Sequence, residues 1–291
     1  MIGIVNPAAA HGKSLEAVRE HLLKRGFSGE FLAPKDSDEA NRFVRERASA
    51  ADAILVGGGD GSIAALVPSI LETKLPLAVV PLGTANDFAR SLDLPHDLDE
   101  ICDMLVAGYS RRVDVGRIGE QYFINTIAGG LPAQAAIGLT SRLKARLGMF
   151  AAVALIPKLV RTAKAVRVTV RGESIAFTTT SLALLVGNGR YVGGIPVRYE
   201  AVDDGLLHLT ICRARSFPEL LSVAFSALLR RLPQDWNVID LSSPWFEIQT
   251  AKPWKIAVDG DVTATTPLRA EVLPGAVEVF VRSPKTNEQA R

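Results

Sequence analysis

The chain has 291 residues, of which 48% are hydrophobic and 22% charged, and this balance excludes a disordered chain and a coiled coil. At about 150 residues per domain the length predicts two domains, with one oversized domain as the alternative. Lysine and arginine (33) nearly balance aspartate and glutamate (31), so the net charge of +2 implies no general attraction to nucleic acid.

The N-terminus favours a cytoplasmic protein. Met1–Pro7 has no basic leader followed by an apolar stretch, so we expect a first strand there rather than a signal peptide. The longest uncharged stretch, Gln121–Ser141, contains glycine, proline and amide side chains, which argue against a helix that spans a membrane. Cys102 and Cys212 form neither a disulfide framework nor a zinc motif.

The first hundred residues alternate strands with helical patterns. Short aliphatic runs predict four buried strands, at Ile2–Val5, Glu30–Ala33, Ala53–Val56 and Leu77–Val80. Helical spacing follows Ser14, and Asp97 with Glu100 resembles a capping box for a helix that stops at Gly108. This order predicts a doubly wound, mostly parallel sheet with helices on both faces.

Beyond about residue 110 the pattern becomes antiparallel and rich in strands. The predicted strands are Arg112–Ile118, Gln121–Ile127, Val166–Arg171, Ile175–Val186, Leu206–Arg213, Trp254–Asp259, Leu268–Leu273 and Ala276–Arg282. Two helical segments, Ser141–Ala165 and Phe217–Leu232, interrupt them. We therefore predict an α/β domain over 1–115, a β-rich domain over 116–282 and a tail over 283–291.

A glycine-rich loop directly follows the third predicted strand. Its residues are Gly57, Gly58, Gly59, Asp60, Gly61 and Ser62. Glycines let backbone amides approach phosphate oxygens, and a helix N-terminus behind them adds positive charge. Asp60 beside those phosphates is useful if it binds Mg²⁺ or accepts a proton. The alternative is an ordinary glycine turn between strand and helix.

Two more polar loops follow predicted parallel strands. Pro81–Arg90 contains Thr84, Asn86 and Asp87, and Asn6-Pro7 precedes Gly12-Lys13-Ser14. Ligands of open parallel sheets lie outside the carboxyl ends of the strands, so these loops are expected to converge with the glycine loop on one crevice. Alternatively, Thr84, Asn86 and Asp87 merely cap a helix.

In order and spacing, these segments resemble the diacylglycerol kinase catalytic-domain family, which includes bacterial lipid kinases and the sphingosine and ceramide kinases. The second half adds matches at Val186-Gly187-Asn188, Gly193-Gly194, Asp204-Gly205-Leu206 and Val258-Asp259-Gly260-Asp261. The likeness covers roughly residues 1–282. The glycine hexapeptide alone also resembles NAD kinases and phosphofructokinases.

The resemblance implies an NAD kinase/phosphofructokinase-like α/β domain followed by an antiparallel β-sandwich domain, with ATP and the acceptor in the cleft between them. It implies that Asp60 lies near Mg²⁺. The nucleotide-binding residues that it implies are Asn6, Pro7, Gly57, Gly58, Gly59, Asp60, Gly61, Ser62, Thr84, Asn86 and Asp87.

The acidic turn of the family corresponds to Asp259–Asp261, so either Asp259 or Asp261 is the expected catalytic base, unless Asp-Gly is only a hairpin turn. A second loop resembles the structural Mg²⁺ site of the family. There Asp204 would bind the ion through water, with the carbonyls of Ala201 and Leu206. A plain turn before a strand is the alternative.

Several positions depart from the family pattern. Ser62 replaces the usual threonine, Ala64-Ala65 replaces an Asn-Glu pair, and Asp261 replaces a glutamate. Pro34 stands where relatives often have a threonine that contacts the nucleotide, and Pro68 is expected to disturb the helix after the glycine loop. These departures predict slow or altered activity.

The segment Ser141–Ala165 contains six basic residues and no acidic residue around an apolar stretch. Such a helix either rests on an anionic membrane surface or covers the β domain with a solvated basic end. The four histidines show no metal-binding spacing.

Taken together, we expect a cytoplasmic kinase that uses ATP and Mg²⁺ to phosphorylate a diacylglycerol-like lipid, with the inner membrane face as a peripheral partner if the basic helix rests on lipid. The alternatives are an NAD-kinase-like or other small-molecule kinase, and a nucleotide-binding regulatory protein with weak catalysis. No nucleic-acid partner is expected.

Overall fold

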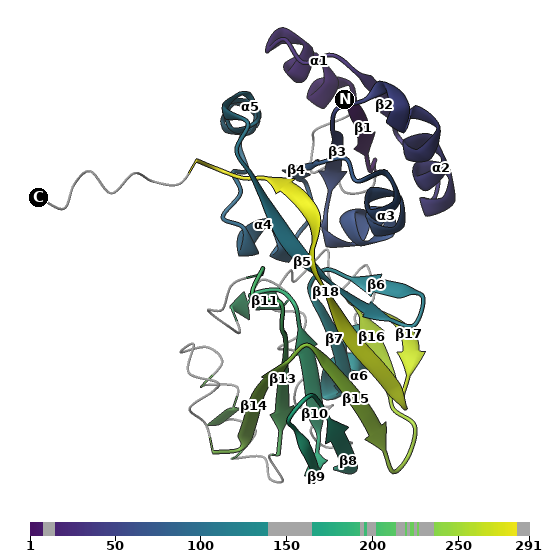
Figure 1. Cartoon of the computed structure of the whole chain (residues 1–291), viewed down its shortest axis with the longest axis vertical. Coiled ribbons are helices and arrows are strands. Elements are labelled where there is room, and N and C mark those ends of the chain that lie inside the picture. The colour runs from purple at the N-terminus through teal and green to yellow at the C-terminus, as the bar shows by residue number, and fades with distance from the viewer. Residues whose placement is uncertain are drawn as a thin grey trace, which may run out of the picture. The chain divides into compact units, whose positions relative to one another are not determined.

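The computed structural model describes residues 1–7, 15–138, 165–192, 195–196, 202–213 and 236–283, together with residues 219, 222, 223 and 226. The chain divides into two compact units (Figure 1). The first combines Met1–Val113 with Ala276–Arg291, and the second is Asp114–Gly275.

The first unit contains a parallel sheet with the strand order β2-β1-β3-β4. The strands are β1 (Ile2–Val5), β2 (Glu30–Leu32), β3 (Ile54–Gly58) and β4 (Leu77–Pro81). Every residue of β1, β3 and β4 is buried, because helices cover a parallel sheet on both faces. The four strands predicted from the sequence are confirmed to within two residues.

The helices of this unit pack in two pairs, α2 on α3 and α1 on α5. They are α1 (Leu15–Lys24), α2 (Ser37–Arg47), α3 (Asp60–Thr73), α4 (Asp87–Ser91) and α5 (Leu98–Ala107), with a 3₁₀ turn at Ala48–Ala50. As predicted, the Asp97 carboxylate caps α5 and Gly108 ends it in a left-handed conformation. The sequence reading missed α2, which Asp36 caps by accepting the Glu39 N–H at 2.8 Å.

The second unit contains an antiparallel sheet of order β14-β13-β10-β7-β16-β17. Its strands are β7 (Thr126–Gly130), β10 (Ala183–Gly187), β13 (Leu207–Cys212), β14 (Val238–Ser243), β16 (Lys255–Val258) and β17 (Asp261–Thr265). The helix α6 (Leu131–Gly138) contacts β7, β16 and β17, and a short ribbon pairs β11 (Tyr191–Val192) with β12 (Ile195–Pro196).

Further antiparallel strands complete this unit in the order β18-β15-β8-β9, and β5 pairs with both β18 and β6. They are β5 (Ser110–Ile118), β6 (Gln121–Phe123), β8 (Val166–Arg171), β9 (Ala176–Ser181), β15 (Trp245–Thr250) and β18 (Leu268–Phe280). Side chains of these strands and of the sheet that contains β7, β10, β13 and β16 share one apolar core. This core includes Phe123, Leu184, Leu209, Phe246 and Ile256. The predicted fold class, a parallel α/β sheet followed by an antiparallel β-sandwich, is confirmed.

Three predicted strand boundaries are wrong, each for a local reason. The predicted strand Ile175–Val186 is two strands, since Leu182 lies between β9 and β10 and these strands join different sheets. The predicted strand Gln121–Ile127 is interrupted because the Asp259 carboxylate accepts the backbone N–H groups of residues 124–126. Conversely, β18 continues through Pro274-Gly275, where two strands were predicted.

The predicted domain limits also differ from the observed units. The second unit begins at Asp114 rather than 116, and residues 276–282 belong to the first unit. The reason is that the end of β18 pairs in parallel with β4, Val279 lying opposite Leu77. This pairing joins residues just over 200 positions apart, and local sequence patterns do not reveal contacts at such a separation.

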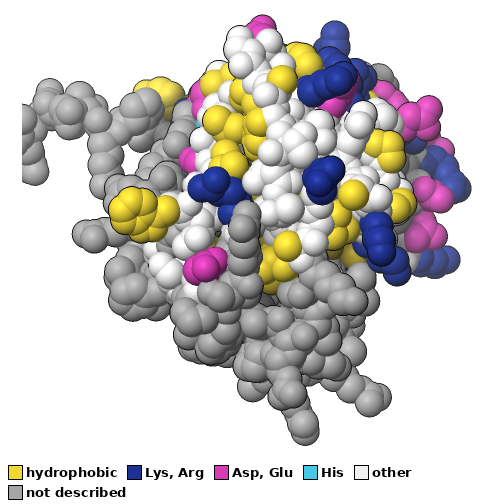
Figure 2. Space-filling model, turned by 90° about the horizontal axis from the view of Figure 1, so that it is seen from below, with side chains coloured by type: hydrophobic (Ala, Val, Ile, Leu, Met, Phe, Trp, Pro, Cys, Tyr) yellow, Lys and Arg dark blue, Asp and Glu magenta, His cyan; other side chains and the backbone are white. Residues whose placement is uncertain are grey.

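Two predicted helical segments fall mostly outside the described residues, namely Ser141–Ala165 and Phe217–Leu232. Among the helices that the structure does describe, none has the length and apolar character needed to cross a bilayer. On the face shown in Figure 2, acidic and basic side chains lie next to one another along the right edge.

Candidate functional site

The glycine loop connects β3 to α3. Gly57 and Gly58 end the strand, Gly59 occupies the N-cap position, and the helix begins at Asp60 with no side-chain cap. A Cβ on Gly58 would lie 2.5 Å from the Cβ of Ser62, so this position has room for glycine alone. Because no side chain caps the first turn of α3, its N-terminus is suited to an anion.

The loop after β1 contacts the same turn. The Asn6 side chain donates from Nδ2 to Ser62 Oγ at 2.9 Å. Pro7 is exposed beside it. The structure thus brings together the predicted nucleotide-binding residues of two loops, Asn6 and Ser62, although they are 56 positions apart.

The loop after β4 lies against the glycine loop. A Cβ on Gly83 would come within 2.5 Å of Gly59 Cα and 2.8 Å of Asn86 Oδ1, so the two backbones are in direct contact. Asn86 has a left-handed φ of 51° and is only 7% exposed. Its side chain accepts from Gly83 N–H at 2.9 Å and donates to Gly83 O at 2.8 Å. The predicted ligand contact Thr84 is exposed on this loop.

Asp60 joins the two loops through its carboxylate. One oxygen accepts the Asp87 N–H at 3.0 Å and the other accepts the Phe88 N–H at 2.8 Å, in the first turn of α4. A negative side chain at a helix N-terminus stabilises the helix through hydrogen bonds and the helix dipole. Asp60 therefore has a structural role that the sequence reading missed, in addition to its place at the head of α3.

The contact between Gly59 and Gly83 leads to a testable prediction. We expect Gly83→Ala to lower the free energy of unfolding by about 1–3 kcal/mol and to reduce nucleotide affinity, since the added methyl group must separate two backbones. Thermal unfolding and an ATP titration measure both effects. In the matched control Gly61→Ala the added Cβ meets nothing within 4 Å, so its stability should stay close to that of the wild type. Equal stability of both variants would contradict the contact.

In the second unit, Asp259 organises the turn between β16 and β17. Its carboxylate accepts from the N–H groups of Ile124 at 2.8 Å, Asn125 at 2.9 Å and Thr126 at 2.8 Å. Its own N–H donates to Thr126 O at 2.8 Å, and its φ of 45° is left-handed. These bonds give the Asp259 side chain a structural role, holding β6 and β7 to the turn.

Asp261 differs from Asp259 in its surroundings. It is the first residue of β17 and is exposed, in a Val258–Asp261 pair of the β16–β17 hairpin. The sequence left open which of these two carboxylates acts as a base. Asp261 is exposed, whereas Asp259 is only partly exposed, and which of them acts as a base stays a prediction.

The predicted Mg²⁺ loop is only partly described, since Ala201 lies outside the described residues. Asp204 accepts the Leu206 N–H at 2.9 Å and lies 3.0 Å from Nε2 of His208. The His208 ring is buried, and its Nδ1 lies 2.9 Å from Ser242 Oγ. Over the described part of the chain, no three His, Cys, Asp or Glu side chains are grouped to hold a metal ion. Mg²⁺ binding at this loop stays a prediction.

Asp114 is a buried carboxylate that the sequence reading did not identify. It is 2% exposed and accepts the N–H groups of Gly205 and Gly275, each at 2.7 Å. Burial raises the pKa of Asp114, those two N–H groups lower it, and the nearby charges of Asp204 and Asp203 raise it further. An aspartate inside the apolar alternation of a strand was the signal available in the sequence.

Asn188, the last residue of the Val186-Gly187-Asn188 motif, contacts the backbone next to both Asp114 and Asp259. Its Nδ2 donates to Asp114 O at 2.8 Å and to Ile124 O at 3.1 Å, so it links the β5 backbone to the segment that Asp259 holds. The glycine-loop residues belong to the first unit, and Asp204, Asp259 and Asp261 belong to the second. Their convergence at one site stays a prediction.

Comparisons with known proteins follow the same division. Residues 1–118 match the diacylglycerol kinase catalytic domain, and residues 127–281 match the YegS C-terminal NAD kinase beta sandwich-like domain. A "Probable lipid kinase YegS-like" of Cronobacter sakazakii is 34% identical over 286 residues, covering 94% of this chain and 93% of that protein. A "Probable lipid kinase YegS" of Salmonella arizonae is 32% identical, with coverage of 94% and 93%.

Solved structures agree with these relatives. A crystal structure described as "a putative diacylglycerol kinase" from Bacillus anthracis superposes with a TM-score of 0.82 at 25% identity. The match covers 97% of this chain and 94% of the Bacillus anthracis chain.

Proposed function

Because the chain belongs to the family of YegS-like lipid kinases, with their diacylglycerol kinase catalytic domain, we propose that it transfers the γ-phosphate of ATP to the hydroxyl group of a diacylglycerol-like lipid. The family makes the chain a lipid kinase with ATP as the phosphate donor. The acceptor, the residue roles and the use of Mg²⁺ are the parts proposed here.

The observation that carries the proposal is the joint construction of the glycine loop and the Gly83 loop. Gly59 and Gly83 are in backbone contact, and beside them α3 begins with no side-chain cap. Glycine backbones of this kind let phosphate oxygens approach closely, while the helix N-terminus favours their negative charge. We assign the triphosphate of ATP to this loop pair, with Thr84 and Asn6 at its edges.

Phosphoryl transfer requires little covalent chemistry from the protein. The hydroxyl oxygen of the lipid forms a bond to the γ-phosphorus. The bond between that phosphorus and the β,γ-bridging oxygen breaks, and ADP leaves with this oxygen. The hydroxyl proton passes to a carboxylate, for which we propose Asp261. Asp259 would then act as a positioning residue that holds the turn, through the three N–H groups it accepts.

Mg²⁺ that accompanies ATP neutralises phosphate charge when bound. The described residues around Asp204 do not by themselves form a cation site, because Asp204 contacts His208 and the Leu206 N–H. No catalytic role is therefore assigned to an ion at that loop. We also propose that the acceptor is met at a membrane surface, because diacylglycerol-like lipids reside in bilayers.

The test is incubation of the purified chain with γ-labelled ATP, Mg²⁺ and three acceptors: a total lipid extract, vesicles that contain diacylglycerol, and NAD. We expect label in the lipid fraction, with a product from diacylglycerol vesicles, and loss of labelling when EDTA removes Mg²⁺. Label in NAD would support the NAD-kinase-like alternative. ATP binding with no labelled lipid would support a regulatory protein.

A further inference from the structure

Helix α3 continues through a proline. Pro68 lies inside the helix Asp60–Thr73, where the sequence predicted a disturbance. Proline has no N–H to donate to the carbonyl of Ala64, and its ring crowds that carbonyl, so the turn around Pro68 is intrinsically weak. The helix nevertheless continues for five residues beyond it, to Thr73.

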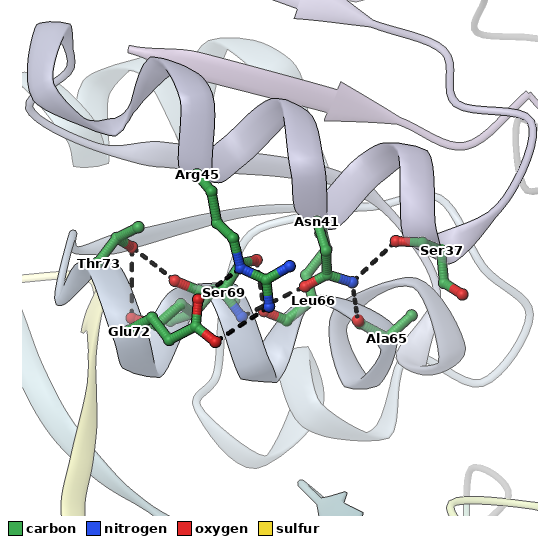
Figure 3. Close-up of polar contacts among 9 residues, drawn as sticks. Ser37, Asn41, Arg45, Ala65, Leu66, Ser69, Glu72 and Thr73 are labelled. Carbon is green, nitrogen blue, oxygen red and sulfur yellow. Dashed lines mark hydrogen bonds and ion pairs between the residues drawn. The ribbon is translucent and has the colours of Figure 1, made fainter.

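The side chain of Asn41, from α2, binds the backbone of α3 at this turn (Figure 3). Its Nδ2 donates to Ala65 O at 2.7 Å, and its Oδ1 accepts the Ser69 N–H at 3.3 Å. Ser69 and Ala65 are the donor and acceptor of the helical hydrogen bond that comes directly after the one Pro68 removes. The amide thus bridges the two backbone groups next to the break.

Asn41 is held in one orientation. The second hydrogen of Nδ2 is donated to Ser37 O at 2.8 Å, one turn earlier in α2. Turning the amide over would place NH₂ against the Ser69 N–H and an oxygen against two carbonyl oxygens. Asn41 and Pro68 line an open surface pocket, but Asn41 is 8% exposed and Ser69 is fully buried, so water replaces the bond to the Ser69 N–H least readily.

The other polar contact between the two helices has a different character. Arg45 reaches Glu72 with its Nε at 2.5 Å and its Nη2 at 3.0 Å, and these side chains are 46% and 54% exposed. Exposed ion pairs contribute little to stability. Asn41 is therefore the contact with the larger expected influence on α3.

We infer that Asn41 is a positioning residue, which holds α3 across its Pro68 break and so fixes the first turn of α3 at the proposed ATP site. The connection is short, since Pro68 lies about two turns after Asp60. A change of direction at the break would move the N-terminal turn, whose Asp60 caps α4 and whose Ser62 binds Asn6. The catalytic half of this inference rests on the proposed function.

The experiment compares wild type, Asn41→Ala, Pro68→Ala and the double variant. We expect Asn41→Ala to lower the melting temperature by about 5 °C and to raise KM for ATP about fivefold, with KM for the lipid unchanged. Pro68→Ala restores the N–H that the helix lacks. In that background Asn41→Ala should therefore change the melting temperature and KM for ATP by less than half as much as in the wild type. Arg45→Ala is the matched control for a contact between α2 and α3, and it should change neither.

The inference would be overturned if Asn41→Ala lowered the melting temperature equally in the wild-type and Pro68→Ala backgrounds. An unchanged KM for ATP in Asn41→Ala would overturn it as well. If Asn41→Ala does not fold, the double variant decides: a folded double variant supports the bridge, and an unfolded one refutes it. Melting temperatures need no substrate. A wild type without kinase activity would therefore count against the proposed function, while the stability comparison would still decide whether Asn41 bridges the break.

Discussion

Replacing Asp60 by alanine is expected to reduce kcat/KM for ATP about 100-fold, because it removes the acceptor that joins the two loops of the proposed ATP site. The N–H groups of Asp87 and Phe88 then lose their partner, and the loop that contains Gly83 and Asn86 is no longer fixed to the head of α3. Loss of this cap should also cost about 1 kcal/mol of stability. Steady-state kinetics with varied ATP and a thermal unfolding curve measure the two effects.

Asp60→Asn tests the hydrogen bonds of the Asp60 side chain separately from its negative charge. Its single amide oxygen still accepts one of the two N–H groups, so its stability should fall between those of the wild type and Asp60→Ala. Its lipid phosphorylation should nevertheless be lost, because the proposed ATP site then lacks the negative charge of the Asp60 carboxylate. The exposed Asp52→Ala serves as the control for removal of an aspartate, with no expected effect. Activity close to that of the wild type in Asp60→Asn would refute the assignment.

Asp261→Asn is expected to lower kcat by about 100-fold or more while the melting temperature stays unchanged, since Asp261 is exposed and serves as the proposed base. KM for ATP should change little, because the residue is assigned to proton transfer rather than to nucleotide binding. Asp261→Glu, which restores the family residue, should preserve or raise activity. A large loss in Asp261→Glu would reject the assignment.

Asp259→Asn is expected to show the opposite pattern. Its carboxylate accepts three N–H groups, and an amide would place NH₂ against at least one of them, so stability should fall by about 1–3 kcal/mol. Asp240→Asn is the control on β14 of the same sheet, where the carboxylate accepts from the Thr210 hydroxyl at 3.0 Å. A catalytic loss in Asp259→Asn without any loss of stability would exchange the two roles.

The three aspartates at the centre of these sites share one physical feature. Asp60, Asp114 and Asp259 each bind backbone N–H groups of a segment distant in sequence. A charged acceptor makes stronger hydrogen bonds than a neutral one, so each carboxylate can hold a distant segment of the chain in place. The sequence indicates that Asp60 and Asp259 matter, although not Asp114, and it does not distinguish a base or metal ligand from a carboxylate that holds a distant segment in place.

The parallel strands of the first unit could be predicted closely because their signal is local. Short aliphatic runs ending at glycine or proline require burial on both faces, and Asp97 and Gly108 mark the ends of a helix by their own conformational preferences. In the second unit the same approach misplaced strand ends. There Leu182 and Gly275 are positions at which the chain changes sheet or binds a distant carboxylate, and the local pattern contains no trace of either event.

The sequence by itself determined the parallel strands of the first unit, the two fold types and the loops that carry glycine and acidic side chains, but it missed α2, β14, β15 and β17. The features that it determined follow from periodicity, turn chemistry and spacing, which act within a few residues. The tertiary structure alone decided that Asp60 caps α4, that Asp259 is committed to three N–H groups while Asp261 is exposed, and that Asn41 supports α3 at Pro68. The partners in these contacts are 24 to 135 positions apart, and only the packing of the folded chain brings them within hydrogen-bonding distance.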